Sequence, residues 1–268
     1  MTKKFQENTI FSKDNFEKYW NDGFIIIKDM LSPEICEYSN SLARIVADDD
    51  YGQIMHLHRE EYLISQSSKK IESLNNLNEK VLFIKKIKQI SKHYEELLKN
   101  PDITNYLDWL YSRQMTGLLT NIFFKEPGTK YSNQEWLPHQ DNNYLSNENG
   151  LYVTVNVAFN YMSEKNGGLF LFPGSHKLGN LDSEKKISYR EKDGKPGNKV
   201  KEVDIKHIKP VACELKKGDV LFMHGLCVHK SSNNNSNDPR PLLSLGYIPY
   251  GEKFDPGFNS KREVKFLN

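Results

Sequence analysis

Two histidines, a carboxylate and an arginine in the second half of the chain have the types and spacing of a metal-dependent active site. His139 and Asp141 stand two residues apart, and His229 and Arg240 follow about 90 and 100 residues later. Two imidazoles and one carboxylate can hold Fe(II) on one face and leave three positions open for a cosubstrate and O₂. An arginine beyond the second histidine could bind the far carboxylate of a 2-oxo acid. The pattern therefore indicates an oxygenase.

A histidine two residues before an acid is not distinctive by itself, because the pattern also occurs at residues 58–60 and 93–95. Residues 93–95 lie in a helical pattern, where side chains two apart point about 200° from each other and cannot share a metal. Alternate residues of a strand face the same side, which favours His139 with Asp141 in an extended segment. A pair formed by His56 and His58 stays an alternative.

The second imidazole is also ambiguous. His224 and His229 both follow the apolar segment 220–223, and either could be a structural histidine. The local sequence does not choose between them.

The elements that must position these residues change character along the chain. Residues 1–115 read as helix-rich, with helix starts after Ser12, at Ser32-Pro33 and at Asn100-Pro101, a longer helix over 79–98 and a short strand over 24–27. From about 116 to 250 short apolar segments alternate with turns, at 118–124, 150–161, 168–172, 210–215, 220–223 and 242–247. This predicts an α+β protein with a mainly β core. The polar stretch 180–207 is either a mobile lid or a solvated insertion.

Composition limits the partners. The 268 residues carry 37 Lys+Arg against 35 Asp+Glu, a net charge of +2 that predicts neither a nucleic-acid nor an anionic membrane partner. No apolar run approaches a membrane span, and the first residues lack the apolar core of a signal peptide. The three cysteines are widely spaced, which fits a reducing compartment. We expect one cytoplasmic domain over residues 1–268 that acts on a small molecule.

Five sequence features in the same order resemble the phytanoyl-CoA dioxygenase family. Residues 167–177 resemble its Asn-Gly-Gly…Pro-Gly-Ser-His signature, and residues 218–231 with Arg240 resemble its distal segment. Residues 21–27 and the helix start at Ser32-Pro33 resemble its opening. The resemblance covers nearly the whole chain. It implies a double-stranded β-helix, or jelly roll, flanked by N-terminal and intervening helices, which binds Fe(II), 2-oxoglutarate and O₂.

The resemblance also resolves the ambiguous histidines. It selects His139, Asp141 and His229 as metal ligands and leaves His176 and His224 structural. Related halogenases lack the carboxylate, so Asp141 favours hydroxylation, with release of succinate and CO₂. Desaturation or ring closure is the alternative.

Further roles concern the cosubstrate. Arg240 would pair with the C5 carboxylate of 2-oxoglutarate through its planar fork. Ser231 lies two residues after His229, on the same face if extended, and could donate a hydrogen bond. Asn121 resembles a family position near the C1 side. Each role has an alternative. Arg240 could be a surface arginine, Ser231 could be a turn hydroxyl, and Asn121 could face solvent from a strand.

One position departs from the family pattern. Asn156 stands where many members carry a tryptophan that packs on the cosubstrate. The other candidates for substrate contact come from position or chemistry: Trp136, Asn143, Tyr144 and Arg59.

Other functional classes compete with a small-molecule oxygenase. A non-catalytic jelly-roll protein would have no reason to retain all four site residues. A zinc hydrolase could use two histidines and one carboxylate but would give Arg240 no task. An oxygenase acting on a protein stays an alternative.

Overall fold

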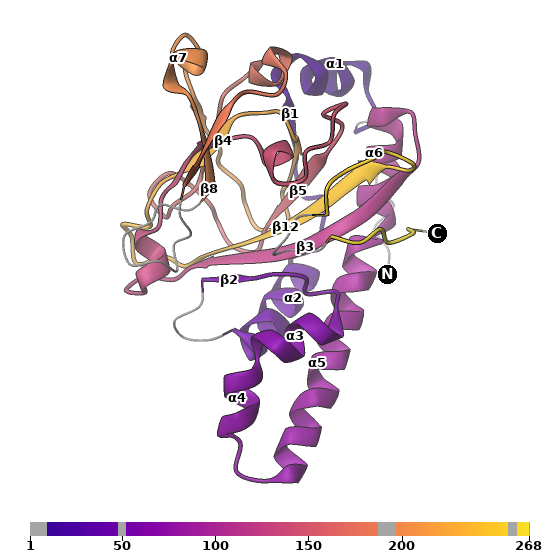
Figure 1. The fold of residues 1–268 in the computed structure, drawn as a ribbon, viewed down its shortest axis with the longest axis vertical. Helices are drawn as coiled ribbons and strands as arrows, with labels where there is room; N and C mark the ends of the chain where they lie inside the picture. The colour runs from indigo at the N-terminus through magenta and orange to yellow at the C-terminus, as the bar shows by residue number, and fades with distance from the viewer. Residues whose placement is uncertain (1–9, 48–51, 187–196, 257–261, 268) are drawn as a thin grey trace.

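Two antiparallel sheets face each other and form the core of the molecule (Figure 1). The structure, a computed structural model, describes residues 10–47, 52–186, 197–256 and 262–267. In spatial order the six strands of the larger sheet are β1 (Phe24–Ile27), β10 (Val220–His224), β5 (Val153–Ala158), β12 (Arg240–Pro249), β3 (Met115–Lys125) and β2 (Gln53–Ile54). The smaller sheet contains β4 (Trp136–His139), β11 (His229–Ser231), β6 (Leu169–Leu171) and β9 (Val211–Ala212).

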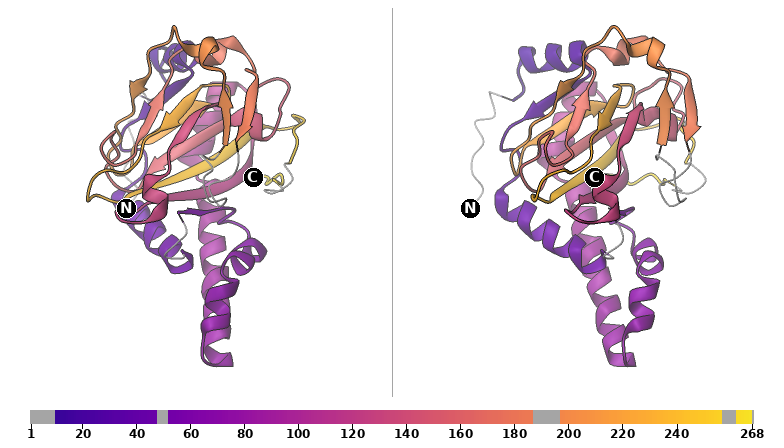
Figure 2. Two further views of the ribbon diagram at one scale, coloured as in Figure 1. Left: turned by 60° about the vertical axis from the view of Figure 1, so that its left-hand side comes forward. Right: turned by 90° about the vertical axis from the view of Figure 1, so that its left-hand side faces the viewer.

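Helices cover the outer side of the larger sheet. They are α1 (Lys13–Asp22), α2 (Pro33–Val46), α3 (Glu60–Gln66), α4 (Ser68–Ser73), α5 (Leu77–Leu98) and α6 (Pro101–Tyr111). Figures 1 and 2 show that α4 and the first half of α5 project away from the sheets. The short α7 (Glu202–Ile205) and three 3₁₀-helices, η1 (Lys130–Asn133), η2 (Asp141–Tyr144) and η3 (Ser175–Leu178), lie in connections.

Side-chain caps explain where the main helices begin. The oxygens of Ser12 and Asn76 accept hydrogen bonds from the backbone N–H three residues later, which satisfies donors that have no partner inside the helix. α2 and α6 each begin with a proline after a capping residue, as predicted. α1 ends at Gly23, where φ is +84° and a Cβ would lie 2.5 Å from Nδ1 of His176. The predicted helix starts are therefore confirmed.

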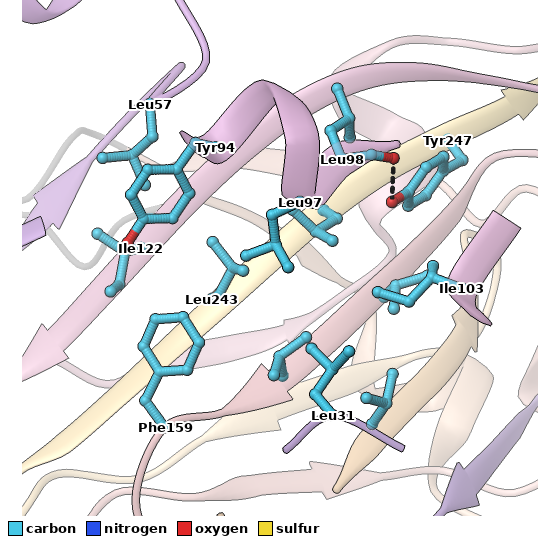
Figure 3. Close-up of a cluster of buried hydrophobic side chains, with 14 of the residues drawn as sticks. Leu31, Leu57, Tyr94, Leu97, Leu98, Ile103, Ile122, Phe159, Leu243 and Tyr247 are labelled. Atoms are coloured by element: carbon cyan, nitrogen blue, oxygen red, sulfur yellow. Dashed lines mark hydrogen bonds between the residues drawn. The ribbon is translucent and has the colours of Figure 1, made fainter. Parts of the chain in front are cut away.

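The core between helices and sheet is built from one face of each strand. Val153, Val155 and Val157 of β5 all point to this outer face, and the residues between them point to the inner face. Figure 3 shows Leu243 of β12 among the buried side chains of this cluster, with the hydroxyl of Tyr247 donating to the carbonyl of Leu98 over 3.0 Å. Each fully buried aliphatic side chain here contributes about 1.5–3 kcal/mol.

The observed architecture confirms the predicted α+β jelly roll, but several elements have no clear sequence signal. β1 matches the predicted strand over 24–27, whereas β2 was not predicted, and the two strands complete both edges of the larger sheet. Residues 180–207 contain the hairpin of β7 (Ser183–Lys186) and β8 (Gly197–Val200), and β8 lies against β4. Residues 187–196 of the expected lid lie outside the described residues, and a lid stays a prediction.

None of the helices in the described ranges is both long and apolar enough to cross a membrane. A cytoplasmic location and a single domain over the whole chain stay predictions.

Candidate metal centre

His139, Asp141 and His229 converge in space, and their ligand atoms all lie within 4.8 Å of one another. The register of β4 with β11 puts His139 directly opposite His229. The Nε2 atoms of both histidines lie 3.6 Å from Oδ1 of Asp141. Atoms at this separation can share one ion, because nitrogen and oxygen ligands bind a metal such as zinc at about 2.0–2.2 Å.

Hydrogen bonds to the far sides of these ligands orient them for a cation. Nδ1 of His139 lies 2.6 Å from the carbonyl of Leu137, and Nδ1 of His229 lies 3.1 Å from the carbonyl of Cys227. A proton on each Nδ1 donates to these carbonyls and leaves the lone pair of Nε2 for a metal. The hydroxyl of Thr154 donates to Oδ2 of Asp141 over 3.1 Å, so Oδ1 is free to ligate.

The charge state of His139 also suits a ligand. Burial, followed by the neighbouring His229, lowers the pKa of His139 to about 4. The imidazole is therefore neutral near pH 7, as metal coordination requires. Two neutral imidazoles and one carboxylate with open positions form the donor set of non-haem Fe(II) oxygenases. The residues present fit that metal.

The prediction that His139 and Asp141 share the face of one strand is wrong. β4 ends at His139, and Asp141 is the first residue of η2. The turn between them is fixed by Gln140, whose side chain is fully buried and donates to the carbonyls of Gly179 and Leu226 over 2.9 and 2.8 Å. Its Oε1 also accepts from the N–H of Leu181 over 2.9 Å. This buried amide brings the two ligands together by a turn.

The rival histidines have other partners. His224 accepts a hydrogen bond at Nδ1 from the N–H of Leu226, and its ring lies 5.2 Å from that of His176. Burial lowers the pKa of His224 to about 3. His58 lies on the outer side of β3, with Nδ1 2.8 Å from Oγ1 of Thr120. Within the described part of the chain, the group at His139 is the one cluster suited to a metal.

Two buried cations lie beside this centre. Arg240, the first residue of β12, pairs in register with Lys125, the last residue of β3. Their exposed fractions are 3% and 0%. Nζ of Lys125 donates to Oγ of Ser231 over 3.0 Å and to the carbonyl of Ser232. Nε of Arg240 has no hydrogen-bond partner among the residues described, and neither cation forms an ion pair with a described carboxylate.

The spacing along β11 connects these cations to the metal ligands. His229 and Ser231 lie on the same face of the strand, about 6.6 Å apart along its axis. A five-carbon 2-oxo diacid can bridge this separation, with its keto-acid end at the metal and its far carboxylate at Ser231 and Arg240. A buried guanidinium without an anion partner is unfavourable, so its burial indicates a site for an anion.

The inner face of the larger sheet carries a row of polar side chains. Ser244 of β12 pairs in register with both Asn121 and Asn156. Oδ1 of Asn121 accepts from the N–H of His56 over 3.3 Å, and Nδ2 of Asn156 has no partner among the described residues. Thr154, which contacts Asp141, lies on the same face two residues from Asn156. The row therefore lines the interior next to the metal ligands.

Two half-buried aromatic rings lie beside His139. The ring centroids of Trp136 and Tyr144 lie 5.7 and 5.9 Å from that of His139, and Asn143 belongs to the same 3₁₀ turn as Tyr144. Arg59 has different partners, with Nε 2.6 Å from Glu61 and Nη2 2.9 Å from Glu263. The structure thus brings four of the five candidate substrate residues to the inner face or beside the triad, and gives Arg59 a pairing role.

The sequence model of the phytanoyl-CoA dioxygenase (PhyH) family matches residues 19–242. The chain belongs to the phytanoyl-CoA dioxygenase family. Phytanoyl-CoA dioxygenase 1 of Oryza sativa subsp. japonica is 33% identical over 125 residues, which cover 47% of this chain and 42% of the rice protein. The chain thus matches less than half the length of that relative.

Solved structures show the fold of this PhyH-family chain. The alpha-ketoglutarate-dependent carbocyclase SnoK from nogalamycin biosynthesis superposes with a TM-score of 0.66 at 18% identity, over 97% of this chain and 91% of SnoK. EctD from S. alaskensis, crystallised with 2-oxoglutarate and 5-hydroxyectoine, gives a TM-score of 0.66 at 15% identity, over 98% and 86%. Both confirm the predicted jelly-roll fold.

Three residues of the site were not predicted from the sequence of this family member. Gln140 lies between the two ligands, Thr154 supports Asp141, and Lys125 pairs with Arg240. Only Lys125 has a sequence signal, since a charged residue ends the otherwise apolar run 122–124. The contacts of Thr154 and Gln140 depend on tertiary packing and leave no local pattern.

Proposed function

We propose that this protein is an Fe(II)- and 2-oxoglutarate-dependent dioxygenase that hydroxylates an unactivated C–H bond of a small molecule. The observation that carries the proposal is the metal-ligand group next to a buried arginine that has no anion partner among the described residues. The first feature suits Fe(II), and the second suits the far carboxylate of the cosubstrate. Together they distinguish this site from a metal hydrolase, which needs no second anion site.

In this proposal His139, Asp141 and His229 hold the iron. Bound iron with 2-oxoglutarate and O₂ supplies the oxidation, in which one oxygen atom enters succinate, the other enters the substrate as a hydroxyl group, and CO₂ is released. The two carbonyls that accept from the histidines, together with Thr154, keep the three ligand atoms pointed at the metal. The protein therefore supplies position and charge, and the metal supplies the redox chemistry.

In this proposal the cosubstrate binds in the interior of the jelly roll, and the substrate binds beside His139. Arg240 and Ser231 bind the C5 carboxylate, and Asn121 lies toward the C1 side. We assign Trp136, Tyr144 and Asn143, which lie beside His139, to substrate contact, and Asn156 to the interior because its Nδ2 has no partner among the described residues. Burial of His139, His229 and Arg240 keeps most water away from them, which strengthens the charged hydrogen bonds of Arg240.

Ring closure and desaturation are the alternatives to hydroxylation. SnoK is a carbocyclase, so ring closure is the second candidate for this chain. EctD was crystallised with a hydroxylated small molecule, and Asp141 fills the coordination position that a halide would need. These two points support hydroxylation.

Anaerobic spectroscopy tests the proposal. We expect Fe(II) and 2-oxoglutarate together, but neither alone, to give the weak visible charge-transfer band of a chelate. Substrate pools can then be screened for succinate release, with the product analysed for a gain of one oxygen atom. Absence of the band together with tight Zn(II) binding would favour a hydrolase. A product that loses two hydrogens without gaining oxygen would identify ring closure or desaturation.

A further inference from the structure

Lys125 is a charged residue that the fold encloses completely. It is the last residue of β3, it lies opposite Arg240, and none of its surface is exposed. The turn at Gly167 makes room for it, because a Cβ there would lie 2.7 Å from Cδ of Lys125. Nδ2 of Asn234 donates to the backbone carbonyl of Lys125 over 2.7 Å. Two loops and two strands thus fix this side chain.

The hydrogen bonds of Lys125 match those of a neutral amine. Nζ donates to Oγ of Ser231 and to the carbonyl of Ser232. A neutral amine has two N–H donors, and an ammonium has three. Both donors of the neutral form are therefore used, and one further donor becomes available only on protonation.

The charges around Lys125 favour the neutral amine in the ligand-free protein. The groups that act on it are Arg240 from β12, which is cationic, and Glu135 from the segment before β4, which is anionic. The Tyr131 phenol of η1 acts on Arg240. Burial, followed by the charge of Arg240, lowers the pKa of Lys125 to about 6, against the weaker effect of Glu135. A carboxylate placed between the two side chains would reverse this balance.

Resting on the proposed use of 2-oxoglutarate, we propose that Lys125 is a second anchor for the C5 carboxylate and takes up a proton when that carboxylate binds. The lone pair of Nζ accepts the proton from a buffer acid or from water, and no bond to carbon changes. The new third N–H then donates to the carboxylate, while the bonds to Ser231 and Ser232 stay in place. Arg240 supplies the other positive charge.

Proton uptake makes cosubstrate affinity depend on pH. The empty site holds fewer protons than the occupied site above about pH 6. The dissociation constant for 2-oxoglutarate is therefore expected to rise by up to about tenfold for each pH unit above that point. A site with Arg240 alone would show no such slope, because its guanidinium is charged in both states.

Calorimetry in buffers of different ionisation enthalpy measures this proton directly. We expect the anaerobic Fe(II) protein to take up about one proton for each 2-oxoglutarate bound near neutral pH. The matched probe 2-oxopentanoate has the same keto-acid end but lacks the C5 carboxylate. It is expected to bind the iron with no proton uptake at Lys125.

Three variants locate the proton. Lys125→Met is expected to weaken 2-oxoglutarate binding by about 10- to 100-fold and to abolish the uptake, while Fe(II) binding persists. Lys125→Arg keeps a permanent cation and is expected to bind 2-oxoglutarate without uptake. Lys130→Met removes an exposed lysine five residues away and serves as the control, with affinity and uptake unchanged.

The outcomes separate this inference from the proposed function. Absence of uptake in the native protein, or uptake that persists in Lys125→Met, overturns the role of Lys125 and leaves the oxygenase intact. Failure of the native protein to bind 2-oxoglutarate with Fe(II) overturns the proposed function itself. Uptake that is lost in Lys125→Met and kept in Lys130→Met supports the second anchor.

Discussion

In the middle of β5 and β12, neighbouring residues that point to opposite faces of the larger sheet are both buried and differ in polarity. On β5, Val155 points out toward the helices, and Asn156, the next residue, points into the jelly roll. On β12, Leu243 points out and Ser244 points in. Burial is therefore not what distinguishes structural from functional residues in this protein. The difference lies in whether the buried side chain has found a partner inside the chain.

The outward side chains in the middle of β12 have their partners inside the chain. Leu243 and its neighbours contact one another and the helices, and the hydroxyl of Tyr247 reaches the carbonyl of Leu98 (Figure 3). The inner face has partners missing, since Nε of Arg240 and Nδ2 of Asn156 find none among the residues described. Beside the candidate metal ligands, these two unpartnered groups indicate where ligands bind, and the apolar outer cluster supplies the stability that offsets their burial.

The largest expected effect is a loss of stability, caused by a substitution on the outer face alone. Leu243→Ala removes a fully buried side chain and leaves a cavity, so we expect the free energy of unfolding to fall by about 2–5 kcal/mol. Denaturant titration measures this change. Binding of Fe(II) and 2-oxoglutarate by the folded fraction is expected to stay within about twofold, because the side chain points away from the site. A large loss of binding in the folded fraction would contradict the division between faces.

The next largest expected effect is a loss of 2-oxoglutarate affinity, caused by a substitution on the inner face alone. Arg240→Met removes the buried guanidinium, so 2-oxoglutarate is expected to bind about 30- to 300-fold more weakly while Fe(II) binding persists. The free energy of unfolding is expected to stay equal or to rise, because an unpaired buried charge is removed. Anaerobic titration of the charge-transfer band and thermal denaturation measure the two quantities. Arg113→Met, which changes a half-exposed arginine, is the control.

The smallest expected effect is a change in the pH dependence of stability, caused by a substitution on the outer side of β3. Burial lowers the pKa of His58 to about 3, below its ordinary value of 6.5. The unfolded chain therefore binds more protons than the folded chain between these values, and stability is lost as the pH falls through this range. This histidine is expected to contribute a slope of up to about 1.4 kcal/mol per pH unit. His58→Gln should flatten the slope, and the exposed His207→Gln should not.

Local sequence rules predict much of the fold because the rules concern neighbours in the chain. The caps at Ser12 and the prolines that begin α2 and α6 act within one turn. β5 shows no alternation of buried and exposed residues, because both of its faces are buried. The predicted strand 150–161 is longer than the observed Val153–Ala158. β2 has only two residues and is defined by its pairing with β3.

The site is less predictable because its contacts are distant in sequence. His229 and His139 lie side by side through strand register, and no local pattern separates His229 from His224. The resemblance to the phytanoyl-CoA dioxygenase family is what selects His229 over His224. The pairing of Lys125 with Arg240 depends on the register of β3 with β12, which follows from tertiary packing.

Gln140 has a consequence for how this protein can change over evolution. Its amide holds the backbone at Gly179 and Leu181, at the start of the polar stretch 180–207. Insertions or deletions beyond Leu181 therefore need not move the turn that carries Asp141. A lineage can therefore lengthen or shorten the connection between β7 and β8 without altering the turn that Gln140 holds. The candidate metal ligands His139, Asp141 and His229 would keep their geometry through such changes.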